Sequence, residues 1–281
     1  MQKLNFRRRS FQSLPCCYLL LFPLIVMLNN CGGGVTLKSH KLIQQDITID
    51  GKTSDWEGKL ISIEKKHISV GFNNDDHYLY ACLVTEDRTV IRQILQWGLT
   101  LWFNPYGKEN KVFGIHYPVG KERRSNRSAI DGWRVSNKQD SMFLSSKFSP
   151  AKLNKIEIIR ADRKERLKFK NLQKLPDIKV KLNFTKNYDH LVYEVKVPLG
   201  SDEKSPYGIG VTDSRVLGIG FETDSFISAL RKRHRRGDYG RGYPGSSSRE
   251  AQSYRKDRND KVPKIPEPLK LWVKVVLTPE K

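Results

Sequence analysis

The sequence predicts an all-β protein, an immunoglobulin-like or jelly-roll-type β-sandwich with one short helix and a long disordered basic loop before the last strand. Three observations support this fold class. Many short segments alternate apolar and polar residues, and turn residues separate them at close spacing. A single segment has clear helical periodicity. A strongly apolar strand pattern returns at the end of the chain, after a stretch with almost no aliphatic residues.

The first expected strands come before the helix. Residues 42–49 form the first of them, and Asp50 and Gly51 end it as a turn. Residues 67–73 and 78–84 alternate on either side of a polar Asn- and Asp-rich turn. This pattern is typical of a β-hairpin.

The one expected helix lies in residues 87–96. Its apolar residues share a single helical face: Val90, Ile91, Ile94 and Leu95. Gly98 follows at the position of a helix C-cap, so the helix should end there.

A second hairpin, residues 98–118, is rich in aromatic residues and follows the helix directly. Its first strand places Leu99, Leu101 and Phe103 on one face, which should be core. Pro105 and Gly107 suit the turn that follows, because proline presets φ and glycine tolerates positive φ. Residues 111–116 alternate again as the return strand.

The second half of the chain contains further strand patterns of unequal strength. The weaker strands are expected in residues 132–136, 141–148 and 155–161, and the stronger ones in residues 179–185, 191–197 and 269–277. Two further strands, in residues 207–211 and 216–222, are interrupted by glycines. Residues 162–170 are densely charged and fit either a loop or a helical turn. The glycines in residues 207–222 lack GxGxxG spacing and indicate bulges or tight packing rather than a nucleotide loop.

A basic insertion separates the last strand from the others. Residues 231–268 combine many charges with Gly, Ser and Pro, so they cannot bury enough apolar surface to order themselves. The insertion begins with a run of five cationic side chains: Arg231, Lys232, Arg233, Arg235 and Arg236. The run is either a solvated loop or a binding segment for an acidic component of the cell envelope.

The N-terminus has the three parts of an export signal. Basic residues precede an apolar stretch, residues 14–28, that is too short to span a bilayer comfortably. Cys31 then stands three residues after Leu28. This arrangement resembles a bacterial lipoprotein signal peptide, in which the cysteine receives the lipid. An uncleaved signal anchor, or ordinary signal-peptidase cleavage nearby, are the alternatives.

These signals divide the chain into three expected parts. Residues 1–30 are the signal peptide, residues 31–41 a flexible tether, and residues 42–281 the sandwich, with the basic insertion inside it. The implied location is the bacterial cell envelope, lipid-anchored at Cys31, on the outer-membrane or periplasmic side. Cys82 is then the one cysteine left for the folded domain, where it reads as a buried strand residue without a disulfide.

The order of several short motifs resembles the family 9 carbohydrate-binding-module-like domains, which are related to the DOMON sandwich superfamily. The motifs are Ile49-Asp50-Gly51 with Trp56, Asn74-Asp75-Asp76 with Leu79-Tyr80, and Tyr193-Glu194 with Pro198. The resemblance implies a sugar-binding type of sandwich, with some relatives that bind haem or other ligands. It also implies a pair of aromatic residues that clamp the ligand, but it assigns no particular residue of this chain to that role.

The candidate ligand-binding residues lie around the aromatic hairpin. Indole and phenol rings can stack on the apolar faces of sugars, and polar groups can bind their hydroxyls. The candidates are Trp97, Trp102, Asn104, Tyr106, His116, Tyr117 and Trp133. Trp56 and Trp272 are expected in the core, and Trp102 fits either core or binding site. The acidic turn at Asp75 and Asp76 fits a tight turn better than a calcium site.

Composition and motifs favour a binding protein over an enzyme. The net charge of +21 attracts anions, but no zinc-finger, helix-turn-helix or RNA-binding motif is present, so no nucleic-acid partner is expected. The histidines lack metal-ligand spacing, and no cofactor is expected. Glu194 and Glu222 are the acids that a hydrolase would need, but no motif links them.

Two hypotheses therefore remain. In the first, the chain is a non-catalytic exported lipoprotein, anchored in a membrane, that binds a glycan or another envelope ligand. In the second, it is a structural or assembly lipoprotein of the cell envelope that docks a protein partner through its sandwich and basic loop.

Overall fold

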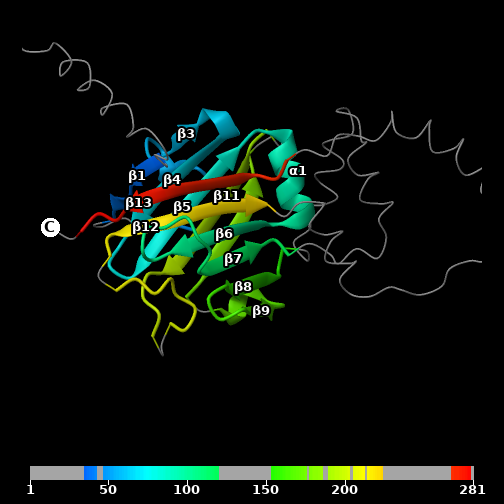
Figure 1. Cartoon of the computed structure of the whole chain (residues 1–281). Helices are drawn as coiled ribbons and strands as arrows, with labels where there is room; N and C mark the ends of the chain where they lie inside the picture. The colour runs from blue at the N-terminus through cyan, green and yellow to red at the C-terminus, as the bar shows by residue number, and fades with distance from the viewer. Residues whose placement is uncertain are drawn as a thin grey trace, which may run out of the picture. The chain divides into compact units, whose positions relative to one another are not determined.

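The strands form two β-sheets that lie face to face (Figure 1). Alternate residues direct apolar side chains into the space between the sheets, which confirms the expected sandwich. The structure is a computed structural model. It describes residues 35–42, 47–119, 153–175, 177–185, 189–202, 205–212, 214–223 and 267–279. The predicted signal peptide, residues 231–266 of the predicted basic insertion, the predicted strands in residues 132–136 and 141–148, and Trp133 lie outside these ranges. Within them, no helix is long and apolar enough to cross a membrane.

Sheet A has seven strands. In spatial order they are β1 (Val35–Lys38), β13 (Lys270–Val276), β12 (Val216–Thr223), β6 (Leu99–Asn104), β7 (Phe113–Tyr117), β8 (Ile156–Arg160) and β9 (Glu165–Phe169). The β1–β13 pair is parallel and the other pairs are antiparallel. The last strand of the chain therefore lies beside the first, and the aromatic hairpin β6–β7 lies near the middle of the sheet.

Sheet B has six strands. Its main order is β10 (Lys179–Phe184), β11 (Leu191–Pro198), β5 (Tyr78–Thr85), β4 (Ile68–Asn74) and β2 (His40–Lys41). The short strand β3 (Ile61–Ile63) also pairs with β4. The predicted hairpin β4–β5 is present, and the predicted strands in residues 179–185 and 191–197 form the antiparallel pair β10–β11.

The main core fills the space between the sheets. Fully buried residues from sheet A, such as Leu101 and Phe221, belong to the same apolar cluster as Val70 and Leu83 of sheet B. Phe72 of sheet B approaches Phe221 of sheet A, with 6.3 Å between the ring centroids. These contacts follow from the period-two alternation of both sheets.

Helix α1 (Arg88–Trp97) forms where the sequence predicts it. The Asp87 carboxylate accepts hydrogen bonds from the backbone N–H groups of Thr89 and Val90, at 2.7 and 3.2 Å, and so caps the N-terminus. Gly98 has a positive φ of 85° and donates its N–H to Ile94 O, which ends the helix.

The predicted tether over residues 31–41 is wrong for its second part, because residues 35–41 form β1 and β2. Leu37 of β1 packs into the main core. Ser39 then lies in a buried network in which its hydroxyl donates to Asn74 Oδ1, and Thr278 N–H donates to Ser39 Oγ at 3.0 Å. These strands escaped prediction because one core residue in a four-residue strand leaves almost no alternation.

The secondary structure expected for residues 162–170, 47–49 and 207–211 differs from the structure observed. Residues 162–170, expected as a loop or helical turn, contain the edge strand β9, whose side chains are largely exposed and so show no apolar period. Residues 47–49 and 207–211 are not strands. Ile47 packs on the outer face of sheet B, and Ile209 fills the core from a loop.

Candidate functional site

A row of residues across the outer face of sheet A contains two tryptophans separated by glycines. In the strand register, Trp272 of β13 pairs with Gly220 of β12, and Gly220 pairs with Trp102 of β6. Trp102 then pairs with Gly114 of β7. The row therefore crosses four neighbouring strands, and we call it the indole row: Trp272, Gly220, Trp102 and Gly114.

The two glycines let the indole rings lie against the backbone of the sheet. A Cβ atom at Gly220 would lie 2.7–2.9 Å from ring atoms of Trp272. One at Gly114 would lie 2.7 Å from two ring carbons of Trp102. Side chains at these positions would lift the rings, so the glycines flatten the aromatic surface.

Trp102 is fixed and covered within this row. Its side chain is only 6% exposed. The indole N–H donates to Glu222 Oε2 at 3.0 Å, and the Lys111 ammonium lies 5.1 Å from the ring centroid. Lys111 also forms an ion pair with Glu222. The ring is thus held by a glutamate and shielded by a lysine.

Trp272 is the more accessible indole of the row. It is half-buried, whereas its strand neighbours Leu271 and Val273 point into the core. Lys270 and Lys274 share its outer face, because each lies two residues away along β13. This corrects the expectation that Trp272 is a core residue. The alternation of residues 270–276 places it with the lysines, a signal that was available in the sequence.

A second row of the same face is polar and internally paired. Thr100 Oγ1 and His116 Nδ1 lie 2.9 Å apart in a hydrogen bond. Glu157, which is almost fully buried, forms ion pairs with Arg166 and Lys168 at 2.9 and 3.4 Å. The polar groups of this row therefore hold one another in place.

The structure separates the sequence-predicted candidates. Asn104 is fully buried and shapes the hairpin tip, since its side chain bonds Asn110 and the backbone of Tyr106 and Lys108. Tyr106 is 70% exposed at that tip, and Tyr117 lies in the main core. Trp97 is half-buried at the end of α1. Among the described candidates, Trp102, Asn104 and His116 lie on the outer face, in three neighbouring rows of the strand register.

The outer face of sheet B is covered by a segment of the chain itself. The 3-10 helix Ser54–Trp56 lies there, with the fully buried Trp56 in a small apolar cluster beside Tyr80 and Cys82. Trp56 Nε1–H donates to Glu194 Oε1 at 2.6 Å, and Gly51 N–H donates to Glu194 Oε2 at 2.5 Å. This face is occupied, so the candidate site lies on sheet A.

Burial is the main cause of the pKa shifts of Glu194 and Cys82, which lie beneath the segment that contains Gly51 and Trp56. It raises the pKa of the Glu194 carboxyl, against the hydrogen bonds from Trp56 and Gly51, which favour the charged form. Burial also raises the pKa of the Cys82 thiol, with the Glu194 charge as a second cause. A thiol that stays protonated is a poor nucleophile, so Cys82 is a packing residue.

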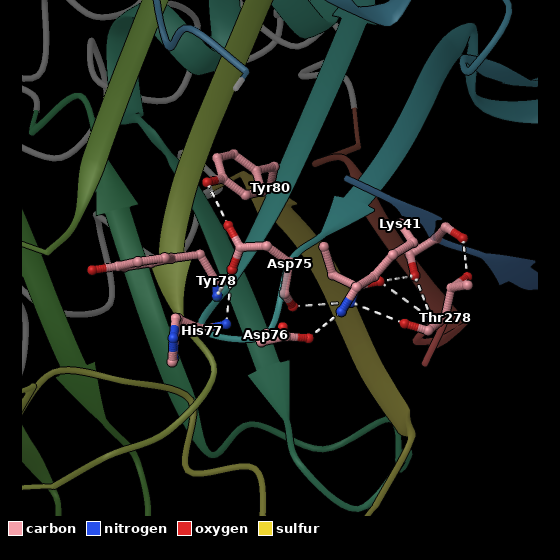
Figure 2. Close-up of polar contacts among 9 residues, drawn as sticks. Lys41, Asp75, Asp76, His77, Tyr78, Tyr80 and Thr278 are labelled. Carbon is pink, nitrogen blue, oxygen red and sulfur yellow. Dashed lines mark hydrogen bonds and ion pairs between the residues drawn. The ribbon is translucent and has the colours of Figure 1, made fainter. Parts of the chain in front are cut away.

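Asp75 and Asp76 form a tight turn between β4 and β5, the structure that the sequence favours over a calcium site (Figure 2). Asp75 Oδ1 accepts from the backbone N–H groups of His77 and Tyr78, at 2.7 and 2.6 Å, and Oδ2 accepts from the Tyr80 hydroxyl at 2.8 Å. Asp76 forms an ion pair with Lys41. Among the described residues, no group of three acidic, histidine or cysteine side chains could hold a metal ion.

Comparisons with known proteins add two distant structural likenesses. No protein-family profile and no curated protein matches the chain. One solved structure is a carbohydrate-binding module of family 9 from Caldicellulosiruptor kristjanssonii in complex with glucose, 7% identical, with a TM-score of 0.36 over 87% of this chain and 97% of that one. The same kind of module in complex with cellotriose gives 8% identity and a TM-score of 0.35, over 87% of this chain and 95% of that one. At these TM-scores we infer nothing about a ligand from either likeness.

Proposed function

We propose that this chain is a non-catalytic, exported lipoprotein whose sandwich binds a saccharide on the outer face of sheet A. The observation that carries the proposal is the indole row, in which the half-buried Trp272 lies flat over Gly220 beside two lysines. A flat indole offers the apolar surface on which the C–H face of a sugar ring stacks. Lysine ammonium groups offer donors for sugar oxygens.

The layout of the carboxylates supports a binding role over hydrolysis. Glu194 lies on the outer face of sheet B and Glu222 on the outer face of sheet A, so the sandwich separates them. Each is also engaged by an indole N–H. A glycosidase needs two carboxyl groups that flank one bond, and these two residues cannot supply such a pair.

The position of the first strand is compatible with a lipid anchor. β1 begins at Val35, four positions after Cys31. Cleavage before Cys31 would therefore leave every strand of the described sandwich intact. The lipidated cysteine would hold the domain at the membrane surface of the cell envelope, and the chain would need no transmembrane helix in its folded part.

Saccharide binding is tested with the purified full chain on a broad glycan array, followed by titration calorimetry on each hit. We expect Trp272→Ala to remove binding. The matched control is Leu167→Ala, which removes another exposed apolar side chain of sheet A at its far edge. An array without hits, or a hit that Trp272→Ala leaves unchanged, would contradict the proposal.

The anchor is tested independently of the ligand. A Cys31→Ser variant expressed in a bacterial host should lose incorporation of labelled fatty acid and move from the membrane fraction to the soluble fraction. Cys82→Ser is the control, because that thiol is buried. Unchanged lipid labelling in Cys31→Ser would disprove attachment at this residue.

A further inference from the structure

Two lysines flank Trp272 on the outer face of sheet A, and a third lies farther along this face. Lys270 and Lys274 lie two residues before and after it on β13. Lys38 lies on the neighbouring strand β1, opposite Val276. Strand geometry places the Cα atoms of Lys270 and Lys274 about 13 Å apart, with the indole between them.

These lysines differ from the other cations of the same face. Lys111 is paired with Glu222, and Arg166 and Lys168 are paired with Glu157, so both acids of the central strands are occupied. Within the part of the chain that the structure describes, Lys38, Lys270 and Lys274 form no ion pair. Glu222 lies opposite Lys270 in the register, but it is already paired with Lys111. Lys270 and Lys274 therefore leave an excess of positive charge around Trp272.

We infer that the ligand of this face is an acidic polysaccharide, which stacks a sugar ring on Trp272 and places its anionic groups against Lys270 and Lys274. The inference rests on the proposed saccharide binding and specifies the chemical class of the ligand. This excess of positive charge raises the local concentration of anions, and the net charge of +21 adds to the field. Lysines two residues to either side of an indole suit a chain whose charges lie on both sides of one stacked ring.

The charge preference can be separated from ring stacking with matched pairs of polymers. Polygalacturonate and its fully methyl-esterified form share one backbone, as do dextran sulfate and dextran. Binding of each polymer to the full chain is measured by calorimetry at low and high salt. We expect the acidic member of at least one pair to bind about tenfold more tightly than its neutral partner at low salt, with the difference shrinking as salt rises.

A double variant assigns that preference to this site. Lys270→Gln with Lys274→Gln should weaken binding of the acidic polymer about tenfold and bring it close to the affinity of the neutral one. The matched control is Lys65→Gln with Lys66→Gln, which removes the same charge from exposed lysines beside sheet B. Equal losses in the two double variants would mean general attraction to a cationic protein and would overturn the inference.

The remaining outcomes are also decisive. Equal affinity for the acidic and neutral members, or binding of neither, overturns the inference. If Trp272→Ala still abolishes the binding of an array hit in that case, the proposed saccharide binding stands and only the inference of an acidic ligand fails. Vesicles of phosphatidylglycerol that compete with the acidic polymer at the same lysines, and bind more tightly than it does, would assign the face to a lipid surface and overturn the inference.

Discussion

Trp56 and Trp102 each donate an indole N–H to a glutamate, one on the outer face of each sheet. On sheet B, the pair Trp56–Glu194 is buried under the segment that contains Gly51. On sheet A, the pair Trp102–Glu222 is contacted by the exposed Lys111, which lies over the indole ring and pairs with the carboxylate. The same pair of residue types therefore fastens a covering segment on sheet B, whereas on sheet A it lies in the same row of strands as the half-buried Trp272.

The largest difference between the faces should appear when a tryptophan is removed from each. Trp56→Ala should lower the free energy of unfolding by about 3–5 kcal/mol, because it empties a fully buried site. Trp272→Ala removes a half-buried surface ring and should cost about 1 kcal/mol or less. Urea unfolding of the two variants measures both. Equal losses would show that Trp272 is as structural as Trp56.

Replacing each glutamate should also destabilise the protein more on sheet B than on sheet A, but by a smaller amount than replacing each tryptophan. Glutamine offers one side-chain acceptor oxygen, so Glu194→Gln leaves one of two buried donors without a partner and should cost about 1–3 kcal/mol. Glu222→Gln can keep the bond from Trp102 and loses only an exposed ion pair, which costs about 1 kcal/mol or less. A larger loss for Glu222→Gln would contradict this difference between the two faces.

The buried glutamate should also give the stability a pH dependence. Its pKa is raised above the ordinary 4.5 in the folded protein, so the folded state binds the proton more tightly than the unfolded state. Its contribution to stability is present below pH 4.5 and is lost as pH rises through the raised pKa. Unfolding measured from pH 4 to 8 should show this trend, and Glu194→Gln should lack it. The same trend in Glu194→Gln would exclude Glu194 as its source.

The smallest effect should come from the lysine over Trp102. Lys111→Ala should change the free energy of unfolding by less than about 1 kcal/mol, because an exposed ion pair contributes little. It should nevertheless increase acrylamide quenching of tryptophan fluorescence, since the Trp102 ring loses its cover. The control is Lys108→Ala on the same hairpin. Unchanged quenching in Lys111→Ala would mean that other groups shield the ring.

Much of the fold could be predicted because the signals are local. The hairpin β6–β7 and the strands β4, β5, β10 and β11 follow from apolar alternation, and α1 follows from its apolar face and Gly98. The edge strands β1 and β9 could not be predicted in this way. β1 is four residues long with one core side chain, and β9 is exposed on most positions, so neither has an apolar period.

The candidate site was predicted less completely than the fold. The sequence indicated the aromatic hairpin, and Trp102 and His116 do lie on the outer face of sheet A. Trp272 was assigned to the core because aromatic residues often pack there. Its alternation with Leu271 and Val273 pointed outward instead, and only the pairing of β13 with β12 brings it beside Trp102.

The sequence alone determined the fold class, the position of most strands and the side of each strand that faces the core, because alternation is a property of neighbouring residues. Only the tertiary structure decided what covers each outer face. Glu194 binds Trp56 across 138 positions of the chain, and Glu222 binds Trp102 across 120. Contacts over such separations depend on strand order and register, which local patterns do not specify.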